Sequence, residues 1–591
     1  MAPTPQQKQT SVGRPRFHFS TDGWINDPCA PGYDPRTGTY HLFYQCNPEG
    51  CEWGNMSWGH IVSKDLLTWT RALQSPALVP DQAYDAEGVF TGCWIPPTSP
   101  LDKTLRVAYS SVKELPFHWS TPPYPRNAAG LSIATSRDGG ETWEKSRNNP
   151  VLRGEPAGLE VTGFRDPFVT ALPSIHYTAG TSATMSYGLI SGGIEGIGPT
   201  AFLYEIQHEN HEEWTYLDTL VDLPARFQPS EKWSGNYGVN WECTNLVTLR
   251  AGSETRHFLI LGAEGDVESH ARHPRPPAGV SSRTVRSQLW LSGEVLMAGQ
   301  GFKFQYGHGG HFDHGPYYAA NSFIDPVSDR SIVYGWIPEE DIPLEAAKAK
   351  GWNGSLAIPR EIFLLRIPKV QKALVSNLAD ICAFETIEES DGSTSVLTLG
   401  VKPIVEMMEL RKTATKVVKL GRVMLPGTDI TGKPATLKTQ SVSWELEAVV
   451  SIHSGCETVG FHVRHSNDLS IRTSVTFSTT TETITVDREA STTDPTINRS
   501  PDSGPFTLLT QKGVSEGDGP AMEKLQLRIF FDGDILEIFA NDRFALATMV
   551  YSGCCSQDTG GITAFATGIS NSAIFETVTV WDGLGTNGEE K

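Results

Sequence analysis

The chain has 591 residues, more than one hydrophobic core usually serves, so we expect two domains or one large domain with a smaller one. Its 39% hydrophobic and 20% charged residues are typical of a globular protein. The net charge of −20 argues against a nucleic-acid surface, which needs basic clusters, and against anionic membranes; a neutral ligand such as a sugar is compatible with it.

Residues 1–16 are polar and contain prolines, without the apolar run of a signal peptide, and no stretch of about 18 apolar residues occurs. The nine cysteines are odd in number and irregularly spaced, which does not resemble a secreted disulfide framework. No C-x-x-C pair points to zinc. We therefore expect a cytoplasmic protein with free thiols and no membrane segment.

Short apolar runs separated by Gly, Pro, Asn and Asp dominate the chain up to about residue 361, and helical periodicity is nearly absent. Many short strands with frequent turns indicate an all-β sandwich, barrel or propeller. The clearest expected strands are 40–45, 105–112, 131–135, 186–191, 201–206, 257–261, 317–323 and 331–337.

One local motif favours the propeller. Ser136–Trp143 has the S-x-D-x-G-x-T-W form of an Asp-box, in which Asp and Ser bond backbone amides and Trp packs between strands of one blade. Ser63–Trp69 is a weaker echo. Two such hairpins suggest blade-like units, and we interpret them as builders of the fold without a chemical role.

The composition changes after about residue 361. Residues 401–412 have a rough apolar face and predict a short helix, which we take as a linker over 401–414. Alternating runs return from 441, and Asp532-Gly533 between two apolar runs predicts a hairpin over 525–539. We thus expect a catalytic domain over 1–400 and a β-sandwich over 415–591.

Three acidic residues lie in unusually apolar settings. Asp27 follows Trp24-Ile25-Asn26 and precedes Pro28, which reads as a strand entering a tight turn; Asp166 sits in FRDPF, and Glu242 in VNWEC. A lone Asp-Pro is most often an Asx-turn, and one buried acid is most often a structural ion pair. Three such acids in one β chain favour a catalytic site, because buried carboxylates are costly unless paired or functional.

Two carboxylates in different environments suit glycoside hydrolysis. One stays ionised and attacks the anomeric carbon, for which Asp27 is the candidate. The other is kept protonated by an apolar setting and donates to the leaving oxygen; Glu242 beside Trp241 fits that role. Asp166, helped by Arg165, could stabilise the hydroxyls of an oxocarbenium-like ring.

These blocks resemble a known family. WINDPC, FRDP and WEC resemble the three signature blocks of glycoside hydrolase family 32, the β-fructofuranosidases, and the chain is most similar to the fungal intracellular invertase and fructosyltransferase group. Order and spacing agree over nearly the whole chain, including WGNMSWGH, FTG, FDHG before YYA, GWNG before IPR, and LEIFAN.

The resemblance implies a five-bladed β-propeller with the site in its axial funnel, followed by a β-sandwich. It implies Asp27 as nucleophile, Glu242 as acid/base and Asp166 as transition-state stabiliser, in a retaining mechanism whose Asp27 and Glu242 carboxyls lie about 5–5.5 Å apart. No metal or cofactor is implied. By similarity the fructosyl pocket is lined by Asn26, Gln45, Trp53, Phe90, Thr91 and Arg165.

The chain departs from the family pattern after WEC. Many hydrolases have an acidic residue two positions on, where this chain has Asn245. A neutral residue there should change acceptor binding and the pKa of Glu242, so we expect fructosyl transfer to a sugar beside hydrolysis. The expected substrates are sucrose and short fructo-oligosaccharides, and the second domain is compatible with a homodimer.

Other patterns leave alternatives open. His308, His311 and His314 resemble a metal cluster, but histidines in a glycine-rich loop near a sugar site more often bond hydroxyls, and His314 fits an acceptor-site wall. A strict hydrolase, a catalytically silent fructan-binding protein and a sialidase-like propeller enzyme are alternatives. The last would need an arginine triad and a tyrosine nucleophile, and the silent binder is disfavoured because all three acids are present.

Overall fold

The computed structural model describes residues 13–97, 102–171, 186–207, 210–265, 267, 280–298, 301–426, 435–512, 519–551 and 559–586. Within these ranges the strands form seven sheets, and no described helix is long and apolar enough to cross a membrane. The described helical segments are α2 (Leu344–Lys350) and the 3-10 helices η1 (Leu378–Asp380) and η2 (Val405–Thr413). The chain is therefore all-β, as its sequence predicts.

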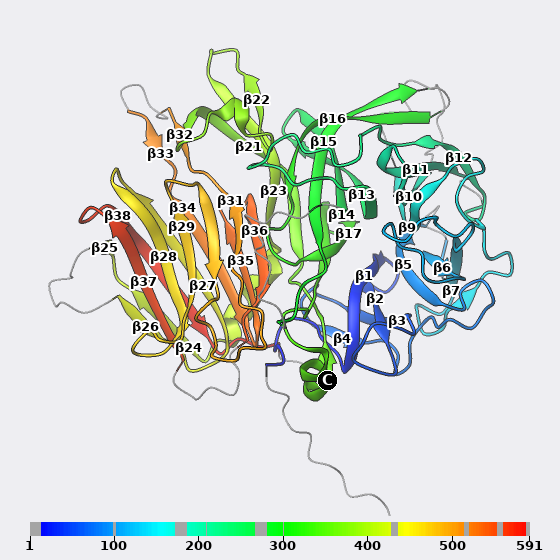
Figure 1. Cartoon of the computed structure of the whole chain (residues 1–591), viewed down its shortest axis with the longest axis horizontal. Coiled ribbons are helices and arrows are strands. Elements are labelled where there is room, and N and C mark those ends of the chain that lie inside the picture. Colours follow the sequence, from blue (N-terminus) through cyan, green and yellow to red (C-terminus); the bar gives the residue numbers. More distant parts are fainter. Residues whose placement is uncertain are drawn as a thin grey trace, which may run out of the picture.

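The first two thirds of the chain form five sheets, on the right and in the centre of Figure 1. In spatial order the first is β19 (Trp352–Asn353), β1 (Gly23–Asp34), β2 (Thr39–Asn47), β3 (Ser57–Ser63) and β4 (Trp69–Arg71). The second is β5 (Gly88–Ile95), β6 (Leu105–Val112), β7 (Ala129–Ser136) and β8 (Glu144–Lys145). The third is β12 (Trp214–Thr219), β11 (Gly198–Ile206), β10 (Ser186–Ile194) and β9 (Val161–Ala171).

The fourth and fifth sheets complete this part. The fourth is β13 (Asn240–Ala251), β14 (Glu254–Glu264), β15 (Arg286–Ala298) and β16 (Gly301–His311). The fifth is β17 (Tyr318–Asp325), β18 (Arg330–Ile337), β21 (Arg360–Ala373), β23 (Thr394–Pro403) and β22 (Glu385–Glu388), with β20 (Ser355–Leu356), β32 (Leu509–Gln511) and β33 (Ala521–Met522) at its sides. The eight clearest predicted strands are confirmed: seven lie within one of these elements, and 317–323 begins one residue before β17.

In each of the five sheets, the strand that comes first in the sequence lies next to the corresponding strands of two other sheets. β1, β5, β9, β13 and β17 contact one another in that order, and β17 in turn contacts β1. The short strand β19 pairs in parallel with β1 and so ties the segment after β18 back to the first sheet. The five sheets thus bring their first strands together, and residues at the start of those strands can share one site.

The two Asp-box turns form as predicted. In the first, Asp138 accepts the Thr142 amide (3.0 Å) and Ser136 Oγ accepts the Gly140 amide (2.8 Å). Trp143 packs against a buried cluster that includes Val107 and Ala134 of its own sheet, and its ring also meets that of Phe43 on β2 at 5.1 Å. The tryptophan therefore lies against a core to which the first and second sheets both contribute.

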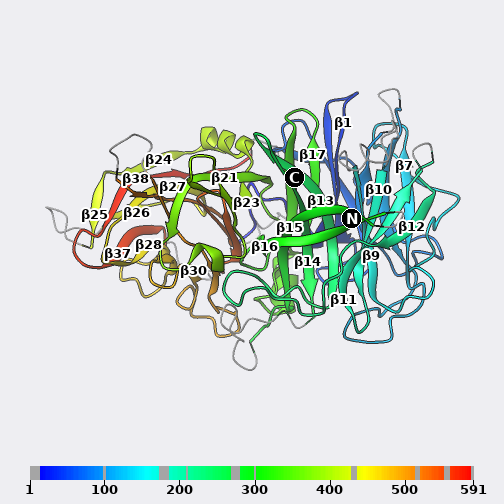
Figure 2. The same ribbon diagram turned by 90° about the horizontal axis from the view of Figure 1, so that it is seen from above.

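The remaining strands form two sheets on the left of Figure 1, and Figure 2 shows them beside the first group. One is β24 (Lys416–Leu420), β38 (Ala573–Asp582), β27 (Ser443–Ile452), β34 (Leu525–Asp532), β35 (Ile535–Ala540) and β36 (Phe544–Met549), with β25 (Val423–Leu425) beside β38. The other is β26 (Thr436–Lys438), β37 (Gly561–Gly568), β28 (Cys456–His465), β29 (Thr473–Ser478), β30 (Thr483–Asp487) and β31 (Asp502–Pro505). Both contribute to one buried apolar cluster, in which Phe461 and Phe575 lie 5.4 Å apart.

The predicted hairpin over 525–539 is present, but its two-residue loop is Gly533-Asp534, one position later than expected.

The helical linker expected over 401–414 contains a shorter helix, because β23 continues to Pro403 before η2 begins. The strands β32 and β33 come from the last third of the chain and extend the fifth sheet through β21. The fifth sheet therefore contains strands from both the first two thirds and the last third of the chain.

A buried histidine fastens the start of the chain to the second part. His18 Nδ1 lies 2.9 Å from Asp532 Oδ2 and its Nε2 lies 3.0 Å from Glu537 Oε1, and all three side chains are buried. Burial alone would lower the pKa of His18, but the hydrogen bonds to the two carboxylates and their charges raise it to about 9. The imidazolium is therefore the stable form at neutral pH.

We predict that His18→Gln removes a pH-dependent part of the stability. Because the pKa of His18 is raised from 6.5 to about 9, its contribution is fully present below pH 6.5 and lost as the pH rises through 9. The contribution should be on the order of 3 kcal/mol. Melting temperatures of both proteins between pH 6 and pH 10 test this: the curves should converge at high pH, and a constant gap, as for an exposed His453→Gln control, would contradict it.

Candidate active site

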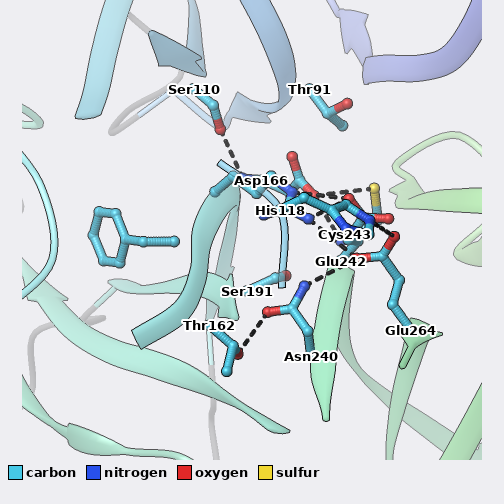
Figure 3. Close-up of polar contacts among 12 residues, drawn as sticks. Thr91, Ser110, His118, Thr162, Asp166, Ser191, Asn240, Glu242, Cys243 and Glu264 are labelled. Atoms are coloured by element: carbon cyan, nitrogen blue, oxygen red, sulfur yellow. Dashed lines mark hydrogen bonds and ion pairs between the residues drawn. The ribbon is translucent and has the colours of Figure 1, made fainter. Parts of the chain in front are cut away.

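A β-bulge interrupts each of the five first strands at the same depth. Two residues oppose one across the ladder at 26–27, 90–91, 243–244 and 319–320, and Asp166 is an extra residue in β9. Asp166 (φ +61°) and Cys243 (φ +48°) adopt left-handed backbone conformations. Bulges redirect side chains that a regular strand would place on alternate faces. Figure 3 shows Asp166 and Glu242 turned toward one region, and the Cys243 thiol lies near both Asp166 and Asp27.

Asp27 lies inside β1 and not in a turn at its end. The turn predicted for WINDPC is wrong: Asn26 and Asp27 form the bulge opposite Gln45, Pro28 resumes the ladder opposite Tyr44, and the strand continues to Asp34. Thr91 Oγ1 donates to Asp27 Oδ2 at 2.5 Å, and Asn26 Nδ2 donates to Asp27 Oδ1 at 3.1 Å. Gln45 Nε2 lies 3.5 Å from Asp27 Oδ2 and also donates to Thr91. These donors fix the carboxylate plane.

Asp166 is buried against the backbone of the neighbouring strands. Its amide donates to Ser110 Oγ (2.7 Å), and the Cys243 amide donates to Asp166 Oδ2 (3.1 Å). The Cys243 thiol lies 3.6 Å from Asp166 Oδ2 and 3.8 Å from Asp27 Oδ2. One sulfur atom therefore separates the two aspartates.

Glu242 is held by an arginine and a tyrosine. Arg165 Nε donates to Glu242 Oε1 at 2.8 Å, and the Tyr318 hydroxyl donates to Glu242 Oε2 at 2.8 Å. Arg165 also donates to Glu264 Oε2 at 3.2 Å. Asn240 Nδ2 donates to the same oxygen at 3.1 Å, and Figure 3 shows Asn240 and Glu264 side by side. Two glutamates thus share one guanidinium.

Burial and the charges of neighbouring carboxylates raise the pKa values of the acids in this cluster. Burial, reinforced by the nearby charge of Glu264, raises the pKa of Glu242, although Arg165 opposes this. Burial also raises the pKa of Asp27, against the hydrogen bonds from Thr91 and Asn26. Burial and the charge of Glu242 hold the pKa of Asp166 well above its usual range. Such a cluster can keep one carboxyl protonated beside an ionised one, which acid–base chemistry requires.

Most of the predicted pocket residues lie around this cluster. Asn26, Gln45 and Thr91 contact Asp27 directly, and Arg165 contacts Glu242. The rings of Trp53 and Phe90 meet edge to face at 6.0 Å, and Trp53 is 50% exposed. An exposed tryptophan packed on Phe90, the neighbour of Thr91 in the chain, offers an apolar face for a sugar ring.

The side-chain amide of Asn245 forms hydrogen bonds mainly with backbone groups. Its Nδ2 donates to the Cys243 carbonyl (2.8 Å) and the Ala320 carbonyl (3.1 Å), and its Oδ1 accepts the amide and hydroxyl of Ser322. It is 2% exposed. The amide therefore joins β13 to β17, and the contacts described for it do not include Glu242.

We predict that Asn245→Asp lowers the stability of the protein. A carboxylate cannot donate to the two carbonyls, so the variant should lose about 2–5 kcal/mol, with a lower melting temperature. An exposed Asn210→Asp change is the control and should leave the melting temperature nearly unchanged. A melting temperature of Asn245→Asp equal to that of the parent protein would contradict the structural role.

His314 is not brought into the carboxylate cluster by any contact described for it. Its ring stacks on Phe544 of β36 at 4.5 Å, and its amide donates to the Ala545 carbonyl at 3.0 Å. The bulky ring fits there because Gly504 leaves room for it. Among the described residues no group of three or more His, Cys, Asp or Glu side chains is placed to hold a metal ion.

Sequence reasoning missed several residues of this site. Glu264 and Tyr318 touch Arg165 and Glu242, and His118 Nε2 lies 3.7 Å from Glu264 Oε1. Tyr318 lies in the YYA run that follows FDHG, but nothing in one sequence distinguishes it from Tyr317. Glu264 ends an apolar strand and is followed by Gly265, the same signal that singled out the other acids.

The described cysteines form no disulfide with one another, and Cys554 and Cys555 lie outside the described residues. Cys29 and Cys243 are buried beside the acids, and burial raises the pKa of both thiols well above the usual range. They are therefore neutral at physiological pH.

Comparisons with known proteins agree with this architecture. Residues 18–377 match the glycosyl hydrolases family 32 N-terminal domain, and residues 406–582 match the family 32 C-terminal domain. Acid beta-fructofuranosidase of Solanum lycopersicum is 32% identical over 355 residues, which cover 59% of this chain and 49% of that protein. The matched region thus spans about half the length of this curated relative.

Two solved structures are similar over nearly the whole chain. Aspergillus kawachii beta-fructofuranosidase complexed with glycerol is 27% identical with a TM-score of 0.83, covering 97% of this chain and 94% of that one. The fructosyltransferase from A. japonicus is 25% identical with a TM-score of 0.82, covering 97% and 95%.

Proposed function

Because the chain belongs to glycosyl hydrolase family 32, we propose that it removes a β-fructofuranosyl group from sucrose or a short fructan and passes it to water or to a sugar. The observation that carries this proposal is the bulge-built cluster of Asp27, Asp166 and Glu242. The names of the similar proteins, a beta-fructofuranosidase and a fructosyltransferase, support both acceptors.

In the proposed first step, Asp27 attacks the anomeric carbon, C2, of the fructosyl group. The bond from C2 to the glycosidic oxygen breaks, and Glu242 gives its proton to that oxygen. The products are a fructosyl ester of Asp27 and, from sucrose, free glucose. The donors Thr91 and Asn26 suit this role, because they fix the nucleophile while leaving it ionised.

In the second step, Glu242, now a carboxylate, takes a proton from the acceptor hydroxyl. The acceptor oxygen bonds to C2 and the ester to Asp27 breaks, so the configuration is retained after two displacements. Arg165 and Tyr318 suit this role, since both donate to Glu242 and stabilise its ionised form between the steps. Its raised pKa favours the protonated form before the first step.

We assign to Asp166 the role of accepting hydrogen bonds from the substrate hydroxyls next to C2. Its position across the Cys243 thiol from Asp27 suits contact with the same sugar ring. Hydrogen bonds that shorten as positive charge develops on the ring stabilise the transition state more than the ground state. On the leaving-group side, Glu264 and His118 are the candidates to bind glucose or an acceptor sugar.

For the fold, we propose that the five sheets up to Pro403 are the blades of a propeller and that the two remaining sheets pack as a β-sandwich. The succession of contacts from β1 through β17 and back to β1 supports the first assignment, and the shared apolar cluster supports the second. The proposed units are 1–400 and 415–591, joined by the segment 401–414 that contains η2.

The proposal is tested by incubating the purified protein with concentrated sucrose and measuring free glucose and free fructose over time. Glucose in excess of fructose, with the missing fructose in short oligosaccharides, is the result expected of a transferase. Equal amounts would identify a strict hydrolase, which keeps the proposed chemistry with water as the acceptor. Release of neither sugar from sucrose or from short fructans would overturn the proposed function.

A further inference from the structure

We infer that Arg286 is a positioning residue that holds both carboxylates of the proposed reaction, Asp27 and Glu242, in place. This inference rests on the proposed function. Arg286 begins β15, and the contacts described for it are with Glu340, Tyr318 and Trp336. It acts through these neighbours, so it is distinct from the groups that touch the substrate.

An ion pair with Glu340 holds the guanidinium of Arg286 in place. Arg286 Nη2 donates to Glu340 Oε1 at 2.8 Å, and the two side chains are only 15% and 19% exposed. The same carboxylate accepts the Thr284 hydroxyl at 2.9 Å and the Thr284 amide at 3.0 Å. Three hydrogen bonds thus fasten the start of β15 to the segment after β18.

Next to Glu340, Asp341 anchors the same segment. Arg283 donates to its two oxygens at 2.8 Å and 2.6 Å, and Arg488 donates to Asp341 Oδ2 at 2.8 Å. Because Arg488 follows β30, this buried network joins the Arg286 support to the second part of the chain. The support is therefore rigid.

One face of the guanidinium leads to Glu242. The Cζ atom of Arg286 lies 4.9 Å from the centre of the Tyr318 ring, and the hydroxyl of that ring donates to Glu242 Oε2 at 2.8 Å. Tyr318 is paired with Trp336 directly before the bulge in β17. The guanidinium over its ring restrains the side chain and aims the hydroxyl.

A second face leads to Asp27. The Cζ atom lies 4.8 Å from the centre of the Trp336 ring, which meets Trp24 at 5.7 Å. Trp24 Nε1 donates to Asn26 Oδ1 at 3.0 Å, which orients the amide so that its Nδ2 donates to Asp27 Oδ1. The Arg286 side chain thus supports one hydrogen-bond donor to each carboxylate: Tyr318 for Glu242 and, through Trp336 and Trp24, Asn26 for Asp27.

Its charge acts on the same pair. The positive charge of Arg286 lowers the pKa of Asp27, which burial raises. The charged and titratable groups facing Arg286 are Glu340, Tyr318, Glu242 and Glu264. Those facing Asp27 are Arg286, Glu242, Asp166 and the thiols of Cys29 and Cys243. Removing the guanidinium should therefore leave Asp27 harder to ionise.

The kinetic test compares Arg286→Met and Arg286→Lys with a matched Arg256→Met control. Arg256 lies on β14, in the same sheet as Arg286, and pairs at 2.6 Å with Glu385 of β22 in the fifth sheet. We expect Arg286→Met to lower kcat by about 100-fold with little change in KM, and to move the acidic limb of the kcat/KM profile to higher pH. Arg286→Lys should restore the limb but not kcat, because it keeps the charge without the planar stack.

A second readout does not depend on turnover. In protein carrying ¹³C-labelled aspartate carboxyls, the resonance absent from Asp27→Asn reports the titration of Asp27, and Arg286→Met should raise its pKa while Arg256→Met leaves it unchanged. An unmoved Asp27 titration, or a kcat loss no larger than that of the control, would overturn the inference. If the parent protein turns over neither sucrose nor fructan, the proposed function falls, and the titration still decides the role of Arg286.

Discussion

Replacing Asp27 by asparagine should lower kcat on sucrose by at least about 10⁴-fold and leave the fold unchanged. The amide has nearly the shape of the carboxylate, so Thr91, Asn26 and Gln45 keep a partner while the nucleophile is lost. Removing a buried charge relieves desolvation, so the melting temperature should stay the same or rise. Glucose release at enzyme concentrations high enough to detect residual turnover is the measurement.

The control for this change is an exposed Asp222→Asn variant, whose carboxylate pairs with Lys303 of β16, the strand at the opposite edge of the fourth sheet from β13. It should retain full activity. Turnover by Asp27→Asn within tenfold of the parent rate would remove Asp27 from the mechanism, and an unfolded variant would be recognised by its circular dichroism and melting curve.

Replacing Glu242 by glutamine should lower kcat by about 10³-fold, within the usual contribution of a general acid–base group. Glutamine can accept from Arg165 through its oxygen and donate its amide hydrogen to the Tyr318 hydroxyl oxygen, but it cannot release a proton to the leaving oxygen. The loss should be smaller with a fructoside whose leaving group needs no protonation. Equal losses with both donors would contradict the assignment of Glu242 as the acid.

The pH profile gives a second check on Glu242. Its raised pKa means that the protonated form survives to higher pH than for an ordinary glutamate, and the rate should fall on the basic side as Glu242 ionises. In Glu264→Gln the repelling charge is gone while Arg165 remains, so the pKa of Glu242 drops and the basic limb should move to lower pH. A basic limb that moves upward would contradict this electrostatic account.

The sequence was informative about strands and about the acids for related reasons. Apolar runs bounded by turn residues mark strands such as β6 and β10, since each buries its side chains against a neighbouring sheet. Asp27, Asp166 and Glu242 stood out because a charged residue inside such a run needs a reason. The resemblance to a family then supplied roles that composition and spacing could not.

What the sequence could not provide is the geometry of the bulges. WINDPC reads equally well as a turn or as a bulge, because both use the same residue types, and the choice depends on Gln45 across the ladder. The partners of Asn245 and His314 could not be predicted for a similar reason. The Asn245 side chain bonds the backbone of β17, which belongs to another sheet, and the His314 ring stacks on Phe544 of β36.

Long-range partners were equally invisible. Arg286 and Glu340 are 54 positions apart, and no local pattern links them. His18 meets carboxylates more than 500 positions later. Such contacts follow from the assembled sheets, so only the structure reveals them.

The measurement that tests the account most directly is capture of the fructosyl ester. Glu242→Gln, which is expected to slow breakdown of the ester, is mixed with a fructoside whose leaving group needs no protonation, quenched in acid and digested. Peptide mass spectrometry should find one fructosyl group on the peptide that contains Asp27. A label on the peptide of Asp166, or turnover of the donor without any label under conditions where the ester should accumulate, would contradict it.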